Sequence, residues 1–306
     1  MRAVQVIVLA KRPVPGRVKT RLTPPYRPEQ AAALARTALA DTVDVVARTR
    51  VVRRVLALEA LADQDPPPPP GAAPVCPGAP GTGGVPRALS GAAGAAAPAS
   101  LVGGWLNERL PGAADGRPAA AGAGVPSALS GAGGVGVPPS LSGAAGAGVP
   151  ASFDVFAQRG GGLDERLAHA FADAYAGCRA PMVLIGMDTP QVTPGLLDAA
   201  AGALDTADAV LGPAADGGFW LLGLRRPDPD LLLGVPMSTV HTGAVQRARL
   251  IYAGLRLADA PRLRDVDTAE DAASVAAAAP HTTFAATHAA LATAVTGTPV
   301  VVGGAS

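Results

Sequence analysis

The chain has no excess of charge of either sign, because its 306 residues contain 25 Lys+Arg and 24 Asp+Glu. Proteins that bind nucleic acid or an anionic membrane through a broad basic surface carry such an excess. We therefore expect neither nucleic acid nor a membrane surface as a partner. Any binding must come from local clusters of charge.

Cysteines and long apolar runs are also scarce. Two cysteines, Cys76 and Cys178, are too few for a disulfide framework or a cysteine-rich metal site, which fits a reducing cytosol. No apolar stretch approaches the roughly 20 residues that span a bilayer. Residues 3–10 are apolar but lack the charged flank and cleavage site of a signal peptide. The sequence predicts a cytoplasmic protein in which residues 3–10 form a buried strand.

Glycine and proline, by contrast, are concentrated in residues 66–152. This segment holds 20 of the 38 glycines and 16 of the 31 prolines, so it can bury too little apolar surface to offset its ordering entropy. A Val-Pro-x-x-Leu-Ser-Gly pattern recurs in it, but one leucine per repeat gives no core for a solenoid. We predict a disordered Gly/Pro/Ala-rich insert at 66–152, within a single domain made of residues 1–65 and 153–296.

Outside the insert, apolar runs alternate with helical patterns. Strands are predicted at residues 3–10, 54–59, 182–187, 208–212 and 219–224. Helices are predicted from Pro28 to about Arg48, over 163–177, and from starts at Thr193-Pro194, Ser238-Thr239 and Thr268. This alternation predicts an α/β fold with a mostly parallel sheet and helices on both faces.

Two charged clusters directly follow predicted strands, at the edge where open α/β sheets bind ligands. Asp188 comes after the strand at 182–187, where it either binds a ligand or only caps a turn. The loop after the first strand contains the cations Lys11, Arg17, Lys19 and Arg21, which suit phosphate. The alternative is that it is only a solvated basic loop. The Walker and G-x-G-x-x-G patterns are absent from it.

Two acidic patterns lie further along the chain. Asp265 and Asp267 are two residues apart, so on an extended segment both would point to one face and share a cation or a polar cluster. Their hard oxygen ligands favour Mg²⁺ or Mn²⁺. Asp216 precedes Gly217-Gly218, which predict either a plain hairpin turn or a place where a substrate approaches the backbone.

Six stretches occur in a specific order: AKRPVPGRVKTRL, QRGGGLDERL, IGMDTPQV, GPAADGGFWLLGL, MSTVHTGA and DVDTAED. Together they resemble the rSAM/selenodomain-associated transferase family, which is described as glycosyltransferases of arsenosugar biosynthesis on the GT-A-like nucleotide-diphospho-sugar transferase fold. The resemblance covers about residues 1–60 and 153–280. The insert is foreign to the family, and Ala269 replaces the proline that is usual in DVDTPED.

The resemblance implies a metal-dependent glycosyltransferase that moves a sugar from a nucleotide-diphospho-sugar donor to a small-molecule acceptor. Its divalent cation, Mg²⁺ or Mn²⁺, is expected at Asp188, Asp265 and Asp267. Substrate-binding residues are expected to be Lys11, Arg17, Lys19, Arg21, Gly217 and Gly218. Lys19 and Asp216 are the expected catalytic residues.

Two alternatives remain open from the sequence. Lys19-Thr20-Arg21-Leu22 is similar to the K-S-R-L of 2-phospholactate guanylyltransferases, which favours a nucleotidyltransferase that releases pyrophosphate. A binding or scaffold protein without catalysis is the other alternative, although the acidic positions argue against it. The sequence carries no signal for an oligomeric state.

Overall fold

The structure is a computed structural model that describes residues 2–59 and 152–296. Residues 66–151 of the predicted insert lie outside these residues, so its disorder stays a prediction. No helix in the described part of the chain is both long and apolar enough to cross a membrane. Cys178 is buried after α2 (Leu163–Gly177) and is disulfide-bonded, which the low cysteine count did not predict.

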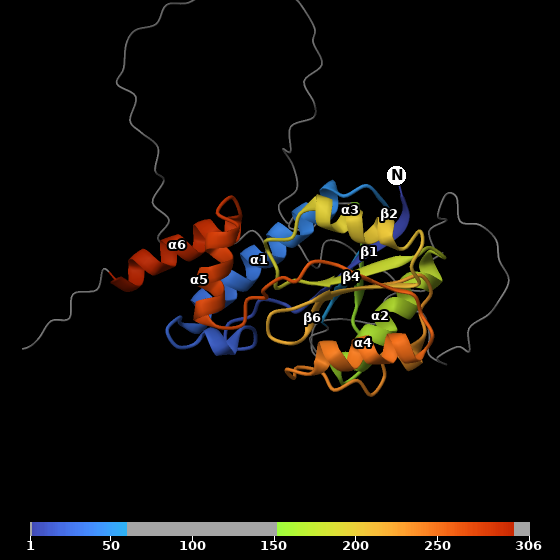
Figure 1. The fold of residues 1–306 in the computed structure, drawn as a ribbon. Coiled ribbons are helices and arrows are strands. Elements are labelled where there is room, and N and C mark those ends of the chain that lie inside the picture. The colour runs from blue at the N-terminus through green and yellow to red at the C-terminus, as the bar shows by residue number, and fades with distance from the viewer. Residues whose placement is uncertain (1, 60–151, 297–306) are drawn as a thin grey trace, which may run out of the picture.

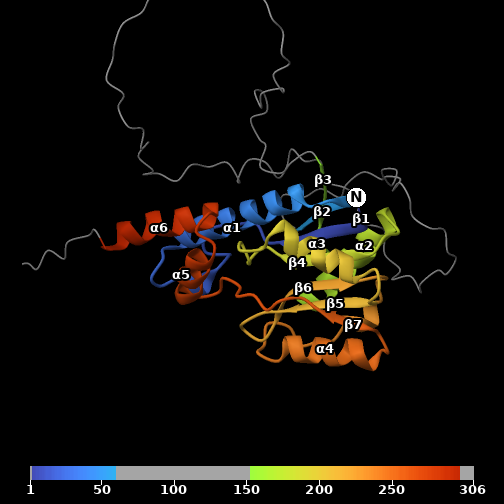
Figure 2. The ribbon, with the colours of Figure 1, turned by 45° about the horizontal axis from the view of Figure 1, so that its top comes forward.

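A seven-stranded sheet with the order β3-β2-β1-β4-β6-β5-β7 forms the centre of the molecule (Figures 1 and 2). Its strands are β1 (Arg2–Ala10), β2 (Val51–Leu58), β3 (Phe153–Ala157), β4 (Met182–Gly186), β5 (Ala209–Pro213), β6 (Phe219–Leu224) and β7 (Leu257–Asp259). Only β6 runs antiparallel to its neighbours β4 and β5. The predicted α/β fold with a mostly parallel sheet is confirmed.

Two of these strands were not predicted. β3 has five residues and follows directly on the insert, and β7 has three, so neither offers a long apolar or alternating pattern. Both lie at the ends of the strand order. Their place is decided by pairing with β2 and β5, which the local sequence does not reveal.

The remaining helices are α1 (Pro28–Arg48), α3 (Pro194–Ala203), α4 (Thr242–Tyr252), α5 (Ala269–Ala278) and α6 (Thr283–Thr296), with short 3-10 helices η1 (Thr20–Leu22) and η3 (Pro229–Leu231). The predicted caps of α3 and α5 are confirmed. Thr193 accepts a hydrogen bond from the Leu196 N–H, and Thr268 forms a reciprocal capping box with Asp271.

The predicted start of α4 at Ser238-Thr239 is wrong, because the helix begins at Thr242. Ser238 has a φ of 58°, in the left-handed region that a right-handed helix does not use. The Thr239 N–H donates instead to the Thr242 hydroxyl at 3.1 Å, and the segment before α4 forms a tight loop.

Helices cover both faces of the sheet (Figure 1). On one face, α1 and α3 bury residues such as Leu39 and Leu197 against the strands. On the other face, α2 and α4 bury residues such as Phe171 and Leu250. Because both faces are covered, the strands are apolar runs rather than alternating ones.

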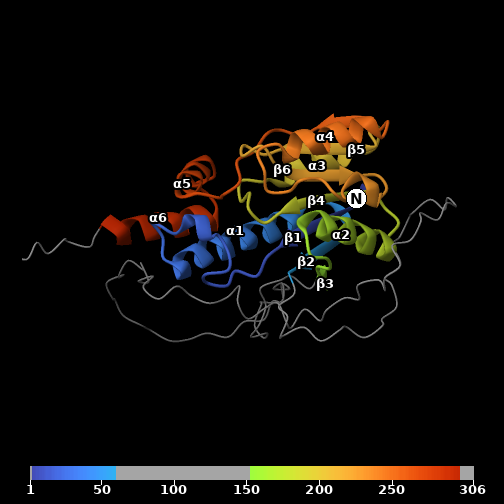
Figure 3. The same cartoon turned by 90° about the horizontal axis from the view of Figure 1, so that it is seen from below.

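A third apolar cluster is formed by residues of α1, α5 and α6, with α6 packed against α1 and α5 against α6 (Figure 3). The first turn of α6, which was not predicted, is held by Asp41, whose carboxylate accepts hydrogen bonds from the Thr283 and Phe284 N–H groups at 3.0 and 2.7 Å. The cluster also buries Leu22 and Val266. It thereby anchors the basic loop after β1 and the acidic segment before α5.

Candidate functional site

The carboxyl ends of β1 and β4 open into a cleft of about 690 Å³. This size is within the range of small-molecule sites, about 300–1,000 Å³. Every site residue predicted from the sequence lines it except Gly217: Lys11, Arg17, Lys19, Arg21, Asp188, Asp216, Gly218, Asp265 and Asp267. The strand order therefore brings together charged groups that lie far apart in the sequence.

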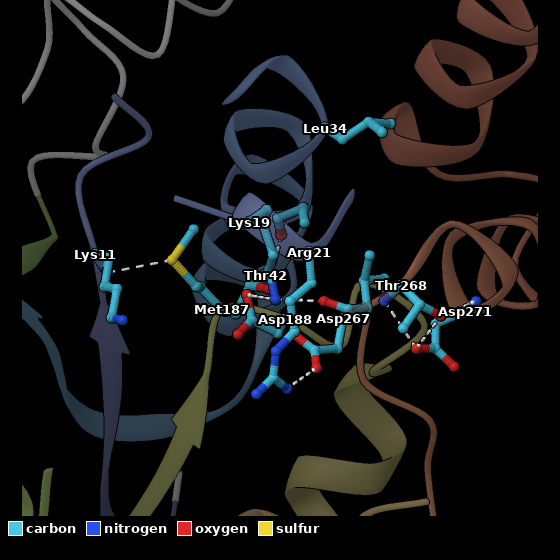
Figure 4. Close-up of polar contacts among 12 residues, drawn as sticks. Lys11, Lys19, Arg21, Leu34, Thr42, Met187, Asp188, Asp267, Thr268 and Asp271 are labelled. Atoms are coloured by element: carbon cyan, nitrogen blue, oxygen red, sulfur yellow. Dashed lines mark hydrogen bonds and ion pairs between the residues drawn. The ribbon is translucent and has the colours of Figure 1, made fainter. Parts of the chain in front are cut away.

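Lys19 is the best-buried cation of the cleft. Its side chain is 9% exposed, and its Nζ lies 2.9 Å from Oδ1 of Asp188 (Figure 4). That oxygen accepts no well-aligned hydrogen bond, so the pairing is chiefly coulombic. Lys19 also has a left-handed backbone with φ 52°, which is uncommon outside glycine and is seen at functional sites.

The backbone of Val266 ties this ion pair to the acidic segment. Its N–H donates to the Asp188 carbonyl at 2.9 Å, and its carbonyl accepts a hydrogen bond from Lys19 Nζ. The Val266 side chain is 1% exposed. The two segments that carry the predicted metal ligands are thus held side by side by one buried residue.

A second ion pair crosses the mouth of the cleft. Arg21 places a guanidinium nitrogen 2.6 Å from Oδ2 of Asp267, and the two side chains are 71% and 33% exposed. The hydrogen bond and charge of Asp267 raise the pKa of Arg21. Exposed pairs of this kind contribute little to stability. Arg21 can therefore exchange its partner for a substrate anion more easily than buried Lys19 can.

Asp265 and Asp216 form the acidic part of the cleft. Burial, and then the charge of Asp216, raise the pKa of Asp265 to about 6, while Lys19 opposes this shift. Asp216 is exposed, and its Oδ1 accepts a hydrogen bond from the Gly218 N–H at 2.7 Å. One oxygen of Asp216 is thus fixed by the turn, and the carboxylate faces the cleft.

The Gly217-Gly218 turn packs against the loop before α4. Gly217 has a φ of 91°, and a Cβ built on it would overlap the carbonyl oxygen of Val240. The Gly243 N–H donates to the Gly217 carbonyl at 2.8 Å. The hairpin prediction is confirmed. Gly217 contacts the backbone of Val240 and does not line the cleft, so its role in substrate binding stays a prediction.

The opposite end of the cleft contains residues that reasoning from single motifs missed. Gln158 follows β3 and donates its amide to the Ala10 and Ala57 carbonyls at 2.8 and 2.9 Å. Arg166 on α2 pairs with Glu59 at 3.0 Å. Both belong to QRGGGLDERL, so only the family resemblance signalled this stretch.

The Lys11 N–H, at the start of the basic loop, contacts the sulfur of Met187 at 3.2 Å (Figure 4). The side chains of Lys11 and Arg17 are exposed. Both residues are available to a ligand that enters from solvent.

The three predicted metal ligands do not form a ready metal site. Within residues 2–59 and 152–296, no group of three or more His, Cys, Asp or Glu side chains could hold a metal ion. Asp188 and Asp267 face Lys19 and Arg21 instead. Their negative charge is already compensated by the basic loop.

The fold is that of the nucleotide-diphospho-sugar transferases. With a TM-score of 0.64 and 22% identity over 95% of each chain, the structure matches the "putative nucleotide-diphospho-sugar transferase from Desulfovibrio desulfuricans G20". The sequence matches the family described as "Uncharacterized protein conserved in bacteria (DUF2064)" over residues 134–239, which include Asp188 and Asp216. None of the curated proteins matches the chain.

Two other solved structures are more distant. One is Rv0371C of Mycobacterium tuberculosis H37Rv in complex with manganese, with a TM-score of 0.38 and 17% identity over 90% of this chain and 98% of that one. The other is CMP:2-keto-3-deoxy-manno-octonic acid synthetase with CTP, with a TM-score of 0.42 and 10% identity over 91% and 98%. At these scores neither bears on the function of this chain.

Proposed function

We propose that this chain is a transferase that binds a nucleotide-diphospho-sugar in the cleft and moves the sugar to a small-molecule acceptor. The observation that supports it is the meeting of two cations from the loop after β1 with two carboxylates from distant segments, as the pairs Lys19–Asp188 and Arg21–Asp267. A diphosphate would pair with the two cations, and a divalent cation would be held by the two carboxylates. The association with arsenosugars remains a prediction from the resemblance, as does a cytoplasmic location.

Lys19 and Arg21 are proposed to bind the diphosphate oxygens, with Lys11 and Arg17 at the entrance. Lys19 gives a point charge from a buried position, and Arg21 gives a planar fork of donors. Donors fixed in place before reaction stabilise the charge that develops on the departing nucleotide diphosphate. Lys19 is the better fixed of the two, because Asp188 and the Val266 carbonyl hold it.

The ligand atoms around Asp188 are of the type that a hard divalent cation prefers, although they are paired with Lys19 and Arg21 in this structure. Oδ1 of Asp188 is buried and lacks a well-aligned hydrogen bond, and the neighbouring candidates Asp265 and Asp267 offer only carboxylate oxygens. Such ligands suit Mg²⁺ or Mn²⁺. When bound, the cation would neutralise the diphosphate of the donor.

Asp216 is the proposed general base. It would accept the proton of the acceptor hydroxyl as that oxygen forms a bond to the anomeric carbon and the bond from this carbon to the diphosphate breaks. Two observations support this role: the carboxylate is exposed to the cleft, and the Gly218 N–H orients it. The nucleotide diphosphate leaves with the bonding electrons.

Nucleotidyl transfer is the second candidate, and the position of Lys19 favours it equally. In this reaction a phosphate or carboxylate oxygen of the substrate attacks the α-phosphate of a nucleoside triphosphate, and pyrophosphate leaves. A buried lysine beside an aspartate stabilises a pentavalent phosphorus centre as well as it stabilises a leaving diphosphate.

One experiment separates the two reactions. The full chain is incubated with Mn²⁺ and either a panel of sugar nucleotides or a panel of NTPs with phosphorylated acids. Release of free NDP from one sugar nucleotide supports glycosyl transfer, and release of pyrophosphate supports nucleotidyl transfer. If no panel member binds in calorimetry and none turns over, both candidates are wrong.

A further inference from the structure

Val240 is an exposed apolar residue inside the cleft. Its exposure is 69%, and the other large exposed apolar residues of the described part of the chain, Ile251 and Tyr252, lie at the end of α4 and not in the cleft lining. A valine exposed to water loses the stabilisation that burial of its apolar side chain would give. A bound ligand that covers Val240 would recover part of it.

The loop that carries Val240 is fixed in place. The Thr242 hydroxyl donates to the Pro236 carbonyl at 2.8 Å and accepts from the Thr239 N–H at 3.1 Å. Gly217 and Gly243 bring the hairpin against the same loop, since a Cβ on Gly243 would lie 2.5 Å from the Gly218 oxygen. The backbone on both sides of the exposed Val240 is therefore fixed by contacts, and the residue does not belong to a loose segment.

Two further apolar side chains extend the surface around Val240. Met237 from the same loop and Phe219 from β6 both line the cleft, and both are partly buried against the core below α2 and α4. The hydroxyl of Thr239 is engaged with that of Thr242 at 3.3 Å. This wall stands beside the turn that carries Asp216, the proposed general base.

We propose that Val240, Met237 and Phe219 form an acceptor subsite, and that the acceptor is an alcohol with an apolar face next to its reacting hydroxyl group. This proposal rests on the proposed transfer function. The hydroxyl would meet Asp216 while the carbon skeleton covers Val240. Fully hydroxylated polyols lack such a face and would leave the valine uncovered.

The first test does not require turnover. Binding of benzyl alcohol, and separately of glycerol, to the full chain is measured by saturation-transfer NMR for wild type and Val240→Asp. We expect binding of benzyl alcohol, little binding of glycerol, and a loss of benzyl alcohol affinity on the order of tenfold in the variant. The matched control is Ile251→Asp, an exposed apolar residue outside the cleft, which should bind like wild type.

A second arm uses whichever donor the panels identify. Benzyl alcohol should raise the release of NDP above the rate with water alone, and Val240→Ser should raise its KM more than it lowers kcat. Equal benzyl alcohol binding by wild type and Val240→Asp, no binding by wild type, or a preference for glycerol would each overturn the subsite. If wild type turns over no donor but Val240→Asp still binds benzyl alcohol more weakly than wild type, the transfer function is contradicted and the subsite is not.

Discussion

At the scale of single residues, the cleft is organised by pairs of opposite charge. Lys19–Asp188 is the better-buried pair, and Arg21–Asp267 is largely exposed. Breaking a buried pair by removing one partner leaves an uncompensated charge, whereas exposed pairs are nearly neutral. Ligand binding should therefore be most sensitive to substitution of Lys19 or Asp188.

Asp188→Asn should abolish the metal dependence of nucleotide binding. Asparagine keeps the shape and still caps a turn, but it removes the charge that attracts Mg²⁺ or Mn²⁺ and that balances Lys19. Turnover should fall on the order of a hundredfold or more. Calorimetric titration of NDP with Mn²⁺ and with EDTA measures the effect, and Asp198→Asn on α3, outside the cleft lining, is the control. Equal metal-dependent affinity in wild type and Asp188→Asn would refute the metal role.

Lys19→Met should have opposite effects on the two ligands. Without the ammonium group, which lies 2.9 Å from Asp188, Mn²⁺ alone should bind more tightly, by about tenfold or more, because two cations no longer compete for one carboxylate. NDP should bind about tenfold or more weakly, because a charge-assisted hydrogen bond is lost.

The matched control is Lys11→Met in the exposed first part of the same loop, which should leave binding of Mn²⁺ alone unchanged. Calorimetry of each ligand by itself measures both effects. If Lys19→Met leaves the Mn²⁺ affinity unchanged, then Lys19 does not compete with the metal ion for Asp188.

At the scale of elements, the β5–β6 hairpin and the start of α4 act as one unit. Gly217→Ala should loosen it, because the new Cβ would overlap the Val240 carbonyl and alanine is strained at a φ of 91°. Gly254→Ala is the control, with a φ of 76° and nothing within 4 Å of the new Cβ. We expect the control to cost about 1–2 kcal/mol of unfolding free energy, and Gly217→Ala to cost more and to weaken acceptor binding. Equal denaturation midpoints would contradict the contact.

The outer edge of the sheet carries a pH-sensitive contact. Arg256, just before β7, holds the pKa of Asp208 at about 2, first through its side-chain hydrogen bonds and then through its backbone N–H. Because this pKa lies below the value of about 3.9 for the unfolded chain, the contact stabilises the fold above pH 4 and is lost as the pH falls towards 2. Asp208→Asn should thus melt at a lower temperature than wild type near pH 6, and the gap should narrow below pH 4. A gap independent of pH in thermal melts would speak against the contact.

At the scale of the whole molecule, the connection from β2 to β3 must cross the sheet. The two strands are parallel neighbours, with Arg54 opposite Phe153 and Leu58 opposite Ala157. The chain therefore leaves β2 at the carboxyl ends of the strands and enters β3 at their amino ends. Such a crossover needs about a dozen residues. The segment 66–152 is far longer than this geometry requires.

Deletion of 66–152 should therefore preserve the fold if the crossover remains long enough. Asp65 joined to Phe153 through about eight flexible residues should melt cooperatively in reducing buffer and bind NDP like the full chain. Asp65 joined directly to Phe153 should lose the pairing of β3, because too few residues remain to cross. Thermal melts and calorimetry measure this, and aggregation of the variant with the longer linker would refute the single-domain prediction.

The sequence by itself determined the elements whose signals are local. The helical patterns of α1 and α2 and the caps at Thr193 and Thr268 depend on residues within a few positions of one another, and they were predicted at their observed places. The ends of β1 and β4 likewise marked the basic loop and Asp188. Alternation of strands and helices was enough for the fold class, because only a few layer arrangements bury such elements.

Only the tertiary structure decided which of these residues meet. Asp188 and Asp267 face Lys19 and Arg21 across more than 160 residues, and Gly217 packs against the backbone of Val240. These contacts follow from the strand order and from the packing of α5 and α6 on α1, which join distant segments. A local pattern reports the conformation of its own segment, whereas the partner of a charge depends on which segments the sheet places side by side.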